Sequence, residues 1–375
     1  MAVDIRQVRS RMDRYRFVDL PFRLFGDNPG WVPPLRLAVH DRLSPKHPAA
    51  AHQTWCTWMA YRDGAPVGRV GACVDRTFDE FHGLSWAWVG FFEAFDDPEA
   101  TAALFEAAWS WSREHGATVA TGPASFTTND ECGLQVDSFD SVPLVLTPQN
   151  PAYYEPLWLG AGWEPAMDLW SWEAERHEIG LSDRQKHGLE RLRLRDDLHI
   201  REMRMKDFDA EVGRFFEVYN QAWAHNWGFA PMTEAEVRHL AKDLKQIIDP
   251  TLGLFVENAA GEQVAVALAL PDTNEALRAH VRSGRLLPLG WAHLLWGVRH
   301  ARRVRVLALG VRPDVASRAV GPMLYQALAE RTLAHPLMQS GEASWILSTN
   351  TPMNKALAGL GGHRGKTWRL YQRTL

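Results

Sequence analysis

Residues 350–362 read NTPMNKALAGLGG, and residues 150–162 read NPAYYEPLWLGAG. Each stretch begins with an asparagine, ends with a glycine and runs into a segment rich in aromatic residues. Asparagine is a preferred N-cap and glycine a preferred helix end, so each stretch predicts a short helix that leads into a strand. The two stretches lie 200 residues apart along the chain. Matched features at a fixed offset indicate that one structural unit occurs twice.

Other landmarks repeat in the same order in both halves of the chain. Each half has an aromatic turn that contains proline, GDNPGWVPPL at residues 26–35 and HNWGFAPMT at residues 225–233. Each then has two apolar segments around a polar turn, at residues 57–75 and 253–272, which is the pattern of a β-hairpin. A further strand, an amphipathic helix and another strand follow before the helix that begins with asparagine.

This order of elements predicts an α+β protein with two tandem units, each a mixed and mostly antiparallel sheet flanked by helices. The first unit spans residues 1–175 and the second spans residues 198–375, with a charged linking helix at residues 176–197. A chain of 375 residues is also too long for one ordinary hydrophobic core, which agrees with two domains.

The composition is that of a globular protein, with 46% hydrophobic and 23% charged residues. A net charge of −4 gives no reason to expect nucleic acid as a partner. The three cysteines have no metal-ligand spacing, so we expect no metal, and their low count is typical of a reducing compartment such as the cytoplasm. Five arginines between residues 6 and 16 leave two alternatives open, a solvated helix face or peripheral contact with the inner membrane.

The order of elements resembles the fold of the GNAT acyltransferases, here in tandem. In that fold the fourth and fifth strands splay apart, and acyl-CoA binds between them with its pyrophosphate at the start of the next helix. The resemblance implies that the second half binds acyl-CoA through Gly310, Val311, Ser317, Arg318, Ala319, Val320, Gly321 and Asn350. Ala316 departs from the Arg or Gln of the family pattern. In the first half Asp96, Asp97 and Glu99 would repel a pyrophosphate, so we expect that half to be degenerate for this role.

The first half has an insertion after its fifth strand that the second half lacks, and this insertion contains NDECG at residues 129–133. Asp130 and Glu131 are adjacent carboxylates just beyond a strand end, which makes them candidates for the general base. A buried carboxylate beside a like charge has a raised pKa, which suits it to take a proton from an amine. Asn129 and Cys132 flank the pair and are expected to contact the substrate. The alternative interpretation is a turn or capping cluster.

A second polar group follows a strand of the second half, in PDTNEAL at residues 271–277. Asp272 is a further candidate base, and Asn274 a candidate substrate contact. The same residues also fit the N-terminus of the helix that follows, and the two interpretations can coexist.

The turn HNWGFAPMT places large aromatic side chains where a solvated turn would not need them. In the GNAT fold the segment between the first two helices covers the acceptor site. The resemblance therefore implies that Trp227 and Phe229 form an apolar lid, with His225 and Asn226 at its polar edge. The alternative is a turn that packs into its own core.

Several longer phrases resemble the bacterial GNAT-like ceramide synthase family. They are PFRLFGDNPGWVPPL, NDECG, YNQAWAHNWGFAPMT, PDTNEAL with GRLLPLG, and SWILSTNTPMNKALAGLGG, and in this order they cover nearly the whole chain. The resemblance implies N-acylation of a sphingoid base, 3-oxosphinganine or sphinganine, by a long-chain acyl-CoA or an acyl carrier protein. Glu131 would be the first choice of base, and backbone N–H groups near Gly310 and Val311 would polarise the thioester carbonyl.

Two other functions remain open because a fold does not set a substrate. One is an acetyltransferase that acts on a small amine or a peptide. The other is a non-catalytic protein that binds acyl-CoA or lipid. A tandem aminoacyl transferase of the Fem type would usually carry a long coiled-coil insertion, and the sequence has none.

Overall fold

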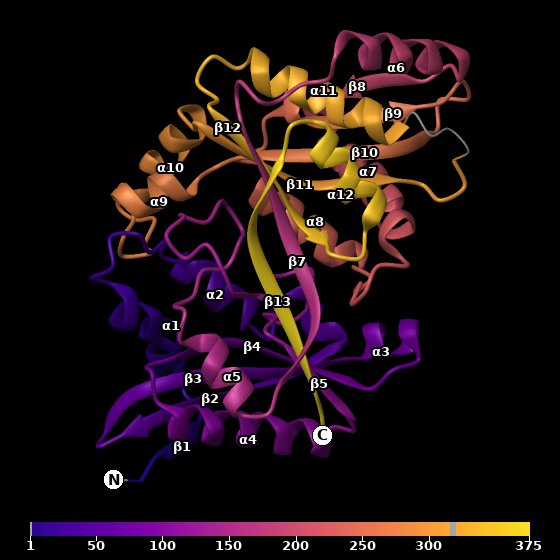
Figure 1. The fold of residues 1–375 in the computed structure, drawn as a ribbon. Coiled ribbons are helices and arrows are strands. Elements are labelled where there is room, and N and C mark those ends of the chain that lie inside the picture. Colours follow the sequence, from indigo (N-terminus) through magenta and orange to yellow (C-terminus); the bar gives the residue numbers. More distant parts are fainter. Residues whose placement is uncertain (1, 316–319) are drawn as a thin grey trace.

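Two halves of similar construction share one continuous sheet, as Figure 1 shows. The structure is a computed structural model that describes residues 2–315 and 320–375. The first half contains β1 (Asp4–Gln7), α1 (Arg11–Phe25), α2 (Arg36–Arg42), β2 (Gln53–Arg62), β3 (Ala65–Asp75), α3 (Arg76–His82), β4 (Trp86–Ala94), α4 (Pro98–Glu114), β5 (Val119–Gly122), β6 (Leu134–Gln135), α5 (Tyr154–Gly160) and β7 (Glu164–Glu175).

The second half follows a connecting helix, α6 (Asp183–Arg195), which lies within the expected linker. It contains β8 (His199–Glu202), α7 (Phe208–Trp223), α8 (Glu234–Leu244), β9 (Gly253–Glu257), β10 (Gln263–Pro271), α9 (Asn274–His280), α10 (Gly290–Arg299), β11 (Arg303–Val311), α11 (Val320–Ala334), β12 (Ser340–Leu347), α12 (Thr351–Gly359) and β13 (His363–Thr374). It repeats the order of the first half except for an additional helix, α10, and the absence of a strand equivalent to β6 among the described residues. This is the α+β arrangement of tandem units that the sequence predicts.

Local sequence explains the hairpin in each half. Asp63 and Gly64 join β2 to β3 and have φ angles of 53° and 78°. A two-residue turn with positive φ at both positions matches the twist of the strands and favours Asp-Gly. In the second half, the turn between β9 and β10 contains Gly261 with a φ of 78°, and the Asn258 side chain accepts hydrogen bonds from the backbone of this turn.

The last strands of the two halves are exchanged at the junction, where the order is β5, β13, β7, β12. β13 of the second half pairs with β5, with Tyr371 opposite Gly122. β7 of the first half pairs with β12, with Trp172 opposite Ala343. β7 and β13 also pair with each other and run side by side through the centre of the molecule in Figure 1. Neither half therefore completes its sheet alone.

The splay between the fourth and fifth strands is filled in the first half. β4 pairs with β5 at Trp86–Trp88 and then diverges from it. The chain that follows β5 turns back onto β4: the N–H of Ala124 donates to the carbonyl of Val89 at 2.9 Å, and the N–H of Phe91 donates to Oγ of Ser125 at 3.0 Å. The backbone of residues 124–125 therefore lies against β4 within the splay of the first half.

The corresponding splay of the second half is not filled in this way. β11 pairs with β12 at Arg303–Val306 and then diverges. Within residues 2–315 and 320–375, no backbone hydrogen bond joins Leu307–Val311 to β12. The side chains of residues 306–309 are apolar and partly exposed. The second half thus presents an accessible apolar strand edge.

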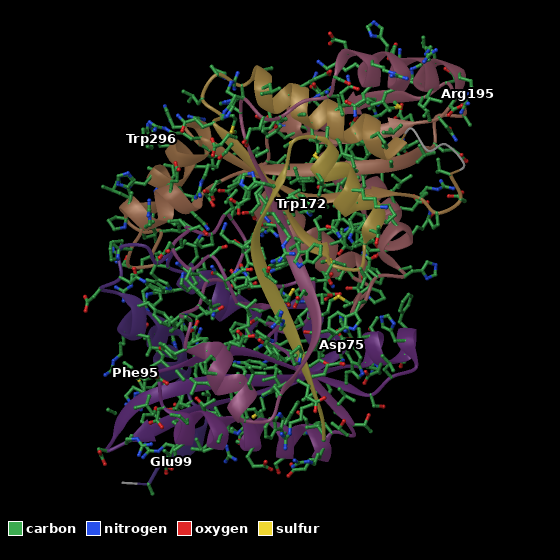
Figure 2. The ribbon with its side chains drawn as sticks, in the orientation of Figure 1. Asp75, Phe95, Glu99, Trp172, Arg195 and Trp296 are labelled. Carbon is green, nitrogen blue, oxygen red and sulfur yellow. The ribbon has the colours of Figure 1, made fainter. Side chains whose placement is uncertain are left out.

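Tryptophans fill much of the interior. Between the first sheet and α4 and α5, the rings of Phe105, Trp109, Trp158 and Trp163 contact one another at centroid distances of 4.6–5.8 Å. Trp172, labelled in Figure 2, lies on β7 and donates its indole N–H to Asn354 of α12 at 2.8 Å. Among the helices in the described part of the chain, none is both long and apolar enough to span a membrane.

Candidate active site

The NDECG loop is anchored through Asp130. Both carboxylate oxygens of Asp130 accept hydrogen bonds from the Arg42 guanidinium at 3.0–3.2 Å, and one also accepts the N–H of Phe126 at 2.8 Å. Arg42 is nearly fully buried and donates in addition to Gln53. The Asp130 carboxylate is thus engaged in holding its own loop against α2.

Glu131 has a different environment from its neighbour. Within the described residues, its carboxylate has no hydrogen bond and no ion pair, and the side chain keeps exposed surface. Burial nevertheless raises the pKa of Glu131, and the charge of Asp130 raises it further. Glu131 is therefore an accessible carboxylate with a raised pKa and no partner among the described residues, as a general base for an amine requires.

The structure brings the NDECG loop together with the HNWGFAPMT turn of the other half. Nδ2 of Asn129 donates to the carbonyl of Ala230 at 2.8 Å, and Oγ1 of Thr128 donates to the carbonyl of Gly228 at 2.6 Å. The hydroxyl of Tyr219, on α7, donates to Oδ1 of Asn129 at 3.3 Å. These two motifs lie about 100 residues apart in the sequence, and they meet beside Glu131.

The turn packs inward through its aromatic residues. Phe229 is buried, and its carbonyl lies 2.7 Å from Nε2 of His82. Trp227 is half-buried and packs on Trp86 of β4 at a ring distance of 5.7 Å. Gly228 has a φ of 68°, and a Cβ at this position would lie 3.2 Å from Thr128. The turn therefore joins the two halves.

The two polar residues before the turn stand at its outer edge. His225 is exposed, and the Asn226 carbonyl accepts the N–H of Phe229 at 3.2 Å. No side-chain hydrogen bond of either residue is present among the described residues. Both remain available to a ligand at the edge of the turn.

Cys132 lies in the core. It is buried, and burial raises the pKa of its thiol to about 12. A thiol with such a pKa is almost entirely protonated near neutral pH, so Cys132 does not provide a nucleophile. Its contribution to any ligand site is apolar packing.

Asp272 and Asn274 hold the insertion of the first half against the second. Oδ1 of Asp272 accepts the N–H of Val145 at 2.9 Å, and Oδ2 pairs with Arg303 at 2.6 Å. Nδ2 of Asn274 donates to the carbonyl of Pro143 at 2.9 Å. Burial raises the pKa of Asp272 against the opposing charge of Arg303. Both side chains are engaged in contacts between the halves.

Sequence reasoning missed Arg42, Tyr219 and Arg305. Arg305 is fully buried at the mouth of the second splay and donates to the carbonyls of Val145, Leu146 and Ser344 at 2.8–3.0 Å. Burial lowers the pKa of Arg305 to about 10. A signal was present, because RVRVLALGV places arginines at alternating positions of an otherwise apolar strand. A buried charge needs a dedicated set of partners.

The described part of the expected acyl-CoA site lies at the end of β11 and at the starts of α11 and α12. Val320 is buried, whereas a Cβ on Gly321, in the first turn of α11, would meet no atom within 4 Å. Gly310 lies under Trp223, whose ring is 2.0 Å from the position of a Cβ at Gly310, so only glycine fits there without movement. Asn350 caps α12 by accepting the N–H of Met353 at 3.2 Å.

Three further residues named for this site, Ser317, Arg318 and Ala319, lie outside the described residues. Val311 is half-buried at the end of β11 and pairs with Ala265 of β10. β10 therefore occupies one edge of β11, and the opposite edge faces the splay. Binding of acyl-CoA along β11 would require this second edge to be free.

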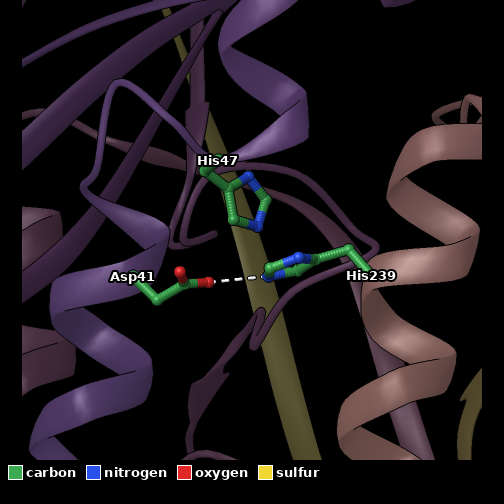
Figure 3. A group of neighbouring side chains, drawn as sticks. All are labelled: Asp41, His47 and His239. Atoms are coloured by element: carbon green, nitrogen blue, oxygen red, sulfur yellow. Dashed lines mark hydrogen bonds and ion pairs between the residues drawn. The ribbon is translucent and has the colours of Figure 1, made fainter.

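One group of side chains has the composition of a metal site. Asp41, His47 and His239 place their ligand atoms within 4.8 Å of one another (Figure 3). Nε2 of His239 lies 2.7 Å from Oδ2 of Asp41, and Nδ1 of His47 accepts the N–H of Ala49. Figure 3 shows that Asp41 lies on α2 and His239 on α8, so their hydrogen bond links the two halves.

A second bridge between the halves is fully formed around His52. Its two ring nitrogens lie 2.8 Å from Asp75 and 3.1 Å from Glu236 of α8, and all three side chains are nearly buried. Hydrogen bonds to Asp75 and then to Glu236 raise the pKa of His52 to about 9. His52 is therefore charged at neutral pH and joins two carboxylates from different halves.

Comparison with known proteins agrees with this architecture. The chain is 37% identical over 379 residues to "Bacterial ceramide synthase" of Caulobacter vibrioides, covering 98% of this chain and 96% of that protein. It is 32% identical over 376 residues to "Protein YghO" of Escherichia coli, with 99% and 95% covered. No profile of a known protein family matches it.

The chain belongs to the bacterial ceramide synthase family. A tandem GNAT protein from the clavulanic acid biosynthesis pathway, solved without acetyl-CoA, superposes with a TM-score of 0.58 at 13% identity, covering 99% of this chain and 98% of that one. This likeness shows that the fold is the tandem GNAT fold. Membership of the ceramide synthase family makes the chain an N-acyltransferase. The resemblance read from the sequence is confirmed.

Proposed function

We propose that this protein transfers a long-chain acyl group from acyl-CoA to the amino group of a sphingoid base, 3-oxosphinganine or sphinganine. The single observation that carries the proposal is Glu131, an accessible and unpaired carboxylate with a raised pKa in a chain of the ceramide synthase family. An acyl carrier protein is the alternative donor. We place the enzyme in the cytoplasm, at the surface of the inner membrane, because its acceptor is a lipid.

The two halves have different roles in this proposal. The second half (residues 198–375) holds acyl-CoA, because its splay leaves residues 307–311 free of β12. The thioester lies along this edge, and the pyrophosphate lies at the start of α11, where helix N–H groups favour an anion. The first half (residues 1–175) is degenerate for the donor, because the backbone of Ala124 fills its splay. It supplies the NDECG loop instead.

The reaction proceeds by direct attack. Glu131 takes a proton from the ammonium group of the base, and the free amine attacks the thioester carbonyl carbon. Backbone N–H groups near Gly310 and Val311 stabilise the negative charge on the carbonyl oxygen. The C–S bond then breaks, the nitrogen loses its second proton to the departing thiolate, and the products are the amide and the free thiol of CoA. Asp130 and Asp272 are assigned positioning roles, because their carboxylates are occupied by Arg42 and Arg303.

Apolar side chains near the site suit a lipid. Trp227, Trp345 and Leu347 are partly exposed and pack on one core cluster, and residues 306–309 add apolar surface along β11. Each methylene of an acyl chain buried against such surface contributes about 0.8 kcal/mol. A long chain therefore gains several times more binding energy than an acetyl group.

The test is mass spectrometry of the products of the purified protein. Palmitoyl-CoA and acetyl-CoA are each supplied with a sphingoid base, a polyamine and a peptide. We expect an N-palmitoylated sphingoid base and free CoA. Acetylated polyamine or peptide would replace the proposed substrates, and acyl-CoA binding without any product would favour a binding protein.

Glu131→Gln tests the assigned base. We expect kcat to fall by roughly 10²-fold or more, because a general base contributes about that much. The matched control is Asp140→Asn, which neutralises an exposed carboxylate of the same insertion. Turnover of Glu131→Gln near that of wild type would remove Glu131 from the mechanism.

A further inference from the structure

Large apolar side chains are exposed together at one end of the second half. They lie on the connection between α9 and α10 and on α10 itself: Leu287, Leu289, Trp291 and Trp296 have exposed fractions of 78%, 62%, 51% and 55%. Figure 2 labels Trp296 at the outer surface of α10. Isolated exposed apolar residues are ordinary, but a contiguous group marks an interaction site.

Contacts with the first half hold this connection in place. The N–H of Arg36 donates to the carbonyl of Gly284 at 3.0 Å, and Nε of Arg36 donates to the carbonyl of Ser283 at 2.6 Å. Arg282 donates to the carbonyl of Gly26. Figure 1 shows α9 and α10 next to α1 and α2 at the same side of the molecule. The exposed side chains are therefore presented on a fixed support.

The adjoining part of the first half continues the same surface. Leu37 of α2 follows Arg36 directly and is 70% exposed, and Met12 of α1 is also exposed. Between the two helices lies a recess of about 400 Å³ lined by Arg11, Arg14, Tyr15 and His40. We call the whole area, from α1 and α2 to the α9–α10 connection and α10, the tip surface.

Cations gather on the tip surface. Arg36 donates to the carbonyl of Ser283, two residues before Arg285, and its pKa is lowered by burial and then by the charge of Arg285. Burial lowers the pKa of His40 as well, followed by the charges of Arg14, Arg36 and Arg11. The acidic groups on these helices are Asp13, which is bonded to Ser10 and lies near Arg16, Asp19, which pairs with Arg36, and Asp41, which contacts His239. Arg14 and Arg285 have no ion pair among the described residues.

We propose that the tip surface docks on a bilayer that contains anionic lipid. Leucine and tryptophan side chains enter the interface between head groups and acyl chains, and the arginines contact lipid phosphates. A second copy of the chain fits less well, because a two-fold contact through this surface would place its arginines against one another. The proposal rests on the proposed function for its purpose, since a sphingoid base reaches the enzyme from a membrane.

The tip surface is connected to the candidate active site. α9 begins at Asn274, which holds the insertion of the first half at Pro143. The same insertion exposes Leu146, whose carbonyl accepts from Arg305 at the mouth of the second splay. The insertion is therefore in contact both with the start of α9, beside the tip surface, and with the mouth of the second splay.

The experiment is co-sedimentation of the full chain with vesicles, without acyl-CoA or sphingoid base. Vesicles of phosphatidylcholine with phosphatidylglycerol are compared with vesicles of phosphatidylcholine alone. We expect binding to the anionic vesicles that weakens as salt is added. The double substitution Leu287→Ser and Leu289→Ser should weaken this binding by about tenfold or more, since two leucines no longer enter the interface.

A matched pair of substitutions controls for the loss of exposed leucines. Leu194→Ser and Leu337→Ser remove exposed leucines from α6 and from the segment after α11, away from the tip surface. This control should bind vesicles as wild type does, and all variants should keep the wild-type Tm because the altered side chains are exposed. A second variant, Arg14→Glu with Arg285→Glu, should lose the preference for anionic vesicles, whereas Arg191→Glu on α6 should keep it.

Three results would overturn the proposal. They are failure of the wild type to bind anionic vesicles, unchanged binding of the Leu287 and Leu289 variant, and a wild-type dimer that this variant converts to a monomer. Because no catalysis is involved, vesicle binding together with absent acyl transfer would overturn the proposed function and leave the docking surface supported. Acyl transfer to a detergent-dispersed base without vesicle binding would do the reverse.

Discussion

β4 and β11 occupy the same place in the two halves, and each has nine residues. Aligned from their first residues, Trp88 of β4 corresponds to Arg305 of β11, and Gly90 corresponds to Leu307. Trp88 and Arg305 are both fully buried. Gly90 admits the backbone of Ala124 into the first splay, whereas Leu307 lines a splay that β12 does not close.

This difference between β4 and β11 indicates how the two copies of a duplicated unit can take different parts in one site. The segment that fills the first splay, beginning at Ala124, continues directly into the loop that carries Glu131. The same insertion then crosses to the second half, where Arg305 and Asp272 hold it. In the proposed mechanism one half gives up its own ligand site and completes the other.

The largest effect is expected where the insertion meets the second splay. Arg305→Met removes the buried guanidinium that donates to three carbonyls, those of Val145, Leu146 and Ser344. We expect the free energy of unfolding to fall by about 4 kcal/mol, because these acceptors lose their partners. Urea unfolding followed by tryptophan fluorescence measures this. The control is Arg302→Met, at the exposed arginine just before β11, which should change stability little. Equal losses of stability in the two variants would contradict the role assigned to Arg305.

Sequence reasoning reached the elements that local chemistry determines. Asp63-Gly64 specifies a tight hairpin turn, and Asn350 specifies a helix N-cap, because each needs only neighbouring residues. The pairing of the NDECG loop with the HNWGFAPMT turn was not predicted as a contact. Each motif stands out in the sequence by its acidic or aromatic residues, but the contact between them depends on how the halves pack.

The exchange of β7 and β13 could not be predicted from the sequence. Neither strand has a strict alternation of buried and exposed residues that would specify its neighbour, so long-range packing decides between β5 and β12. The same reason limited the interpretation of Asp272. Its carboxylate accepts the N–H of Val145, which lies 127 residues away in the chain.

The second-largest effect is expected at His52 and tests whether the two halves unfold together. His52→Gln breaks the buried bridge from Asp75 to Glu236. The pKa of His52 is about 9 in the folded protein against an ordinary value of 6.5. The stabilisation is therefore fully present below pH 6.5 and is lost as the pH rises through about 9. We expect the substitution to lower the free energy of unfolding at pH 6 by about 3 kcal/mol.

The measurement is the Tm of wild type and His52→Gln between pH 6 and pH 10. The two curves should approach each other at high pH, because the wild-type bridge is then discharged. The matched control is His177→Gln, at an exposed histidine. A constant difference in Tm across this range would show that the loss at His52 is one of packing and not of charge. Two transitions in the calorimetry of His52→Gln would show that the two halves unfold separately once this bridge is broken.

The smallest effect comes from reopening the first splay. A Cβ on Gly90 would lie 1.9 Å from the carbonyl oxygen of Ala124, which is backbone and cannot turn aside. Gly90→Ala should therefore lower the free energy of unfolding by about 2 kcal/mol through overpacking. Gly321→Ala is the control in the second half, since a Cβ there meets no atom within 4 Å, and it should leave stability unchanged.

Acyl-CoA binding by Gly90→Ala decides what the filled splay does. If the first half only supports the NDECG loop, binding of acyl-CoA per folded molecule should stay near wild type in Gly90→Ala at a temperature well below its Tm. Gly321→Ala should instead weaken acyl-CoA binding, because its new methyl group enters the space at the start of α11. Calorimetric titration with acyl-CoA measures binding by both variants. If Gly90→Ala loses acyl-CoA binding and Gly321→Ala keeps it, the donor binds to the first half, and the roles argued from β4 and β11 are reversed.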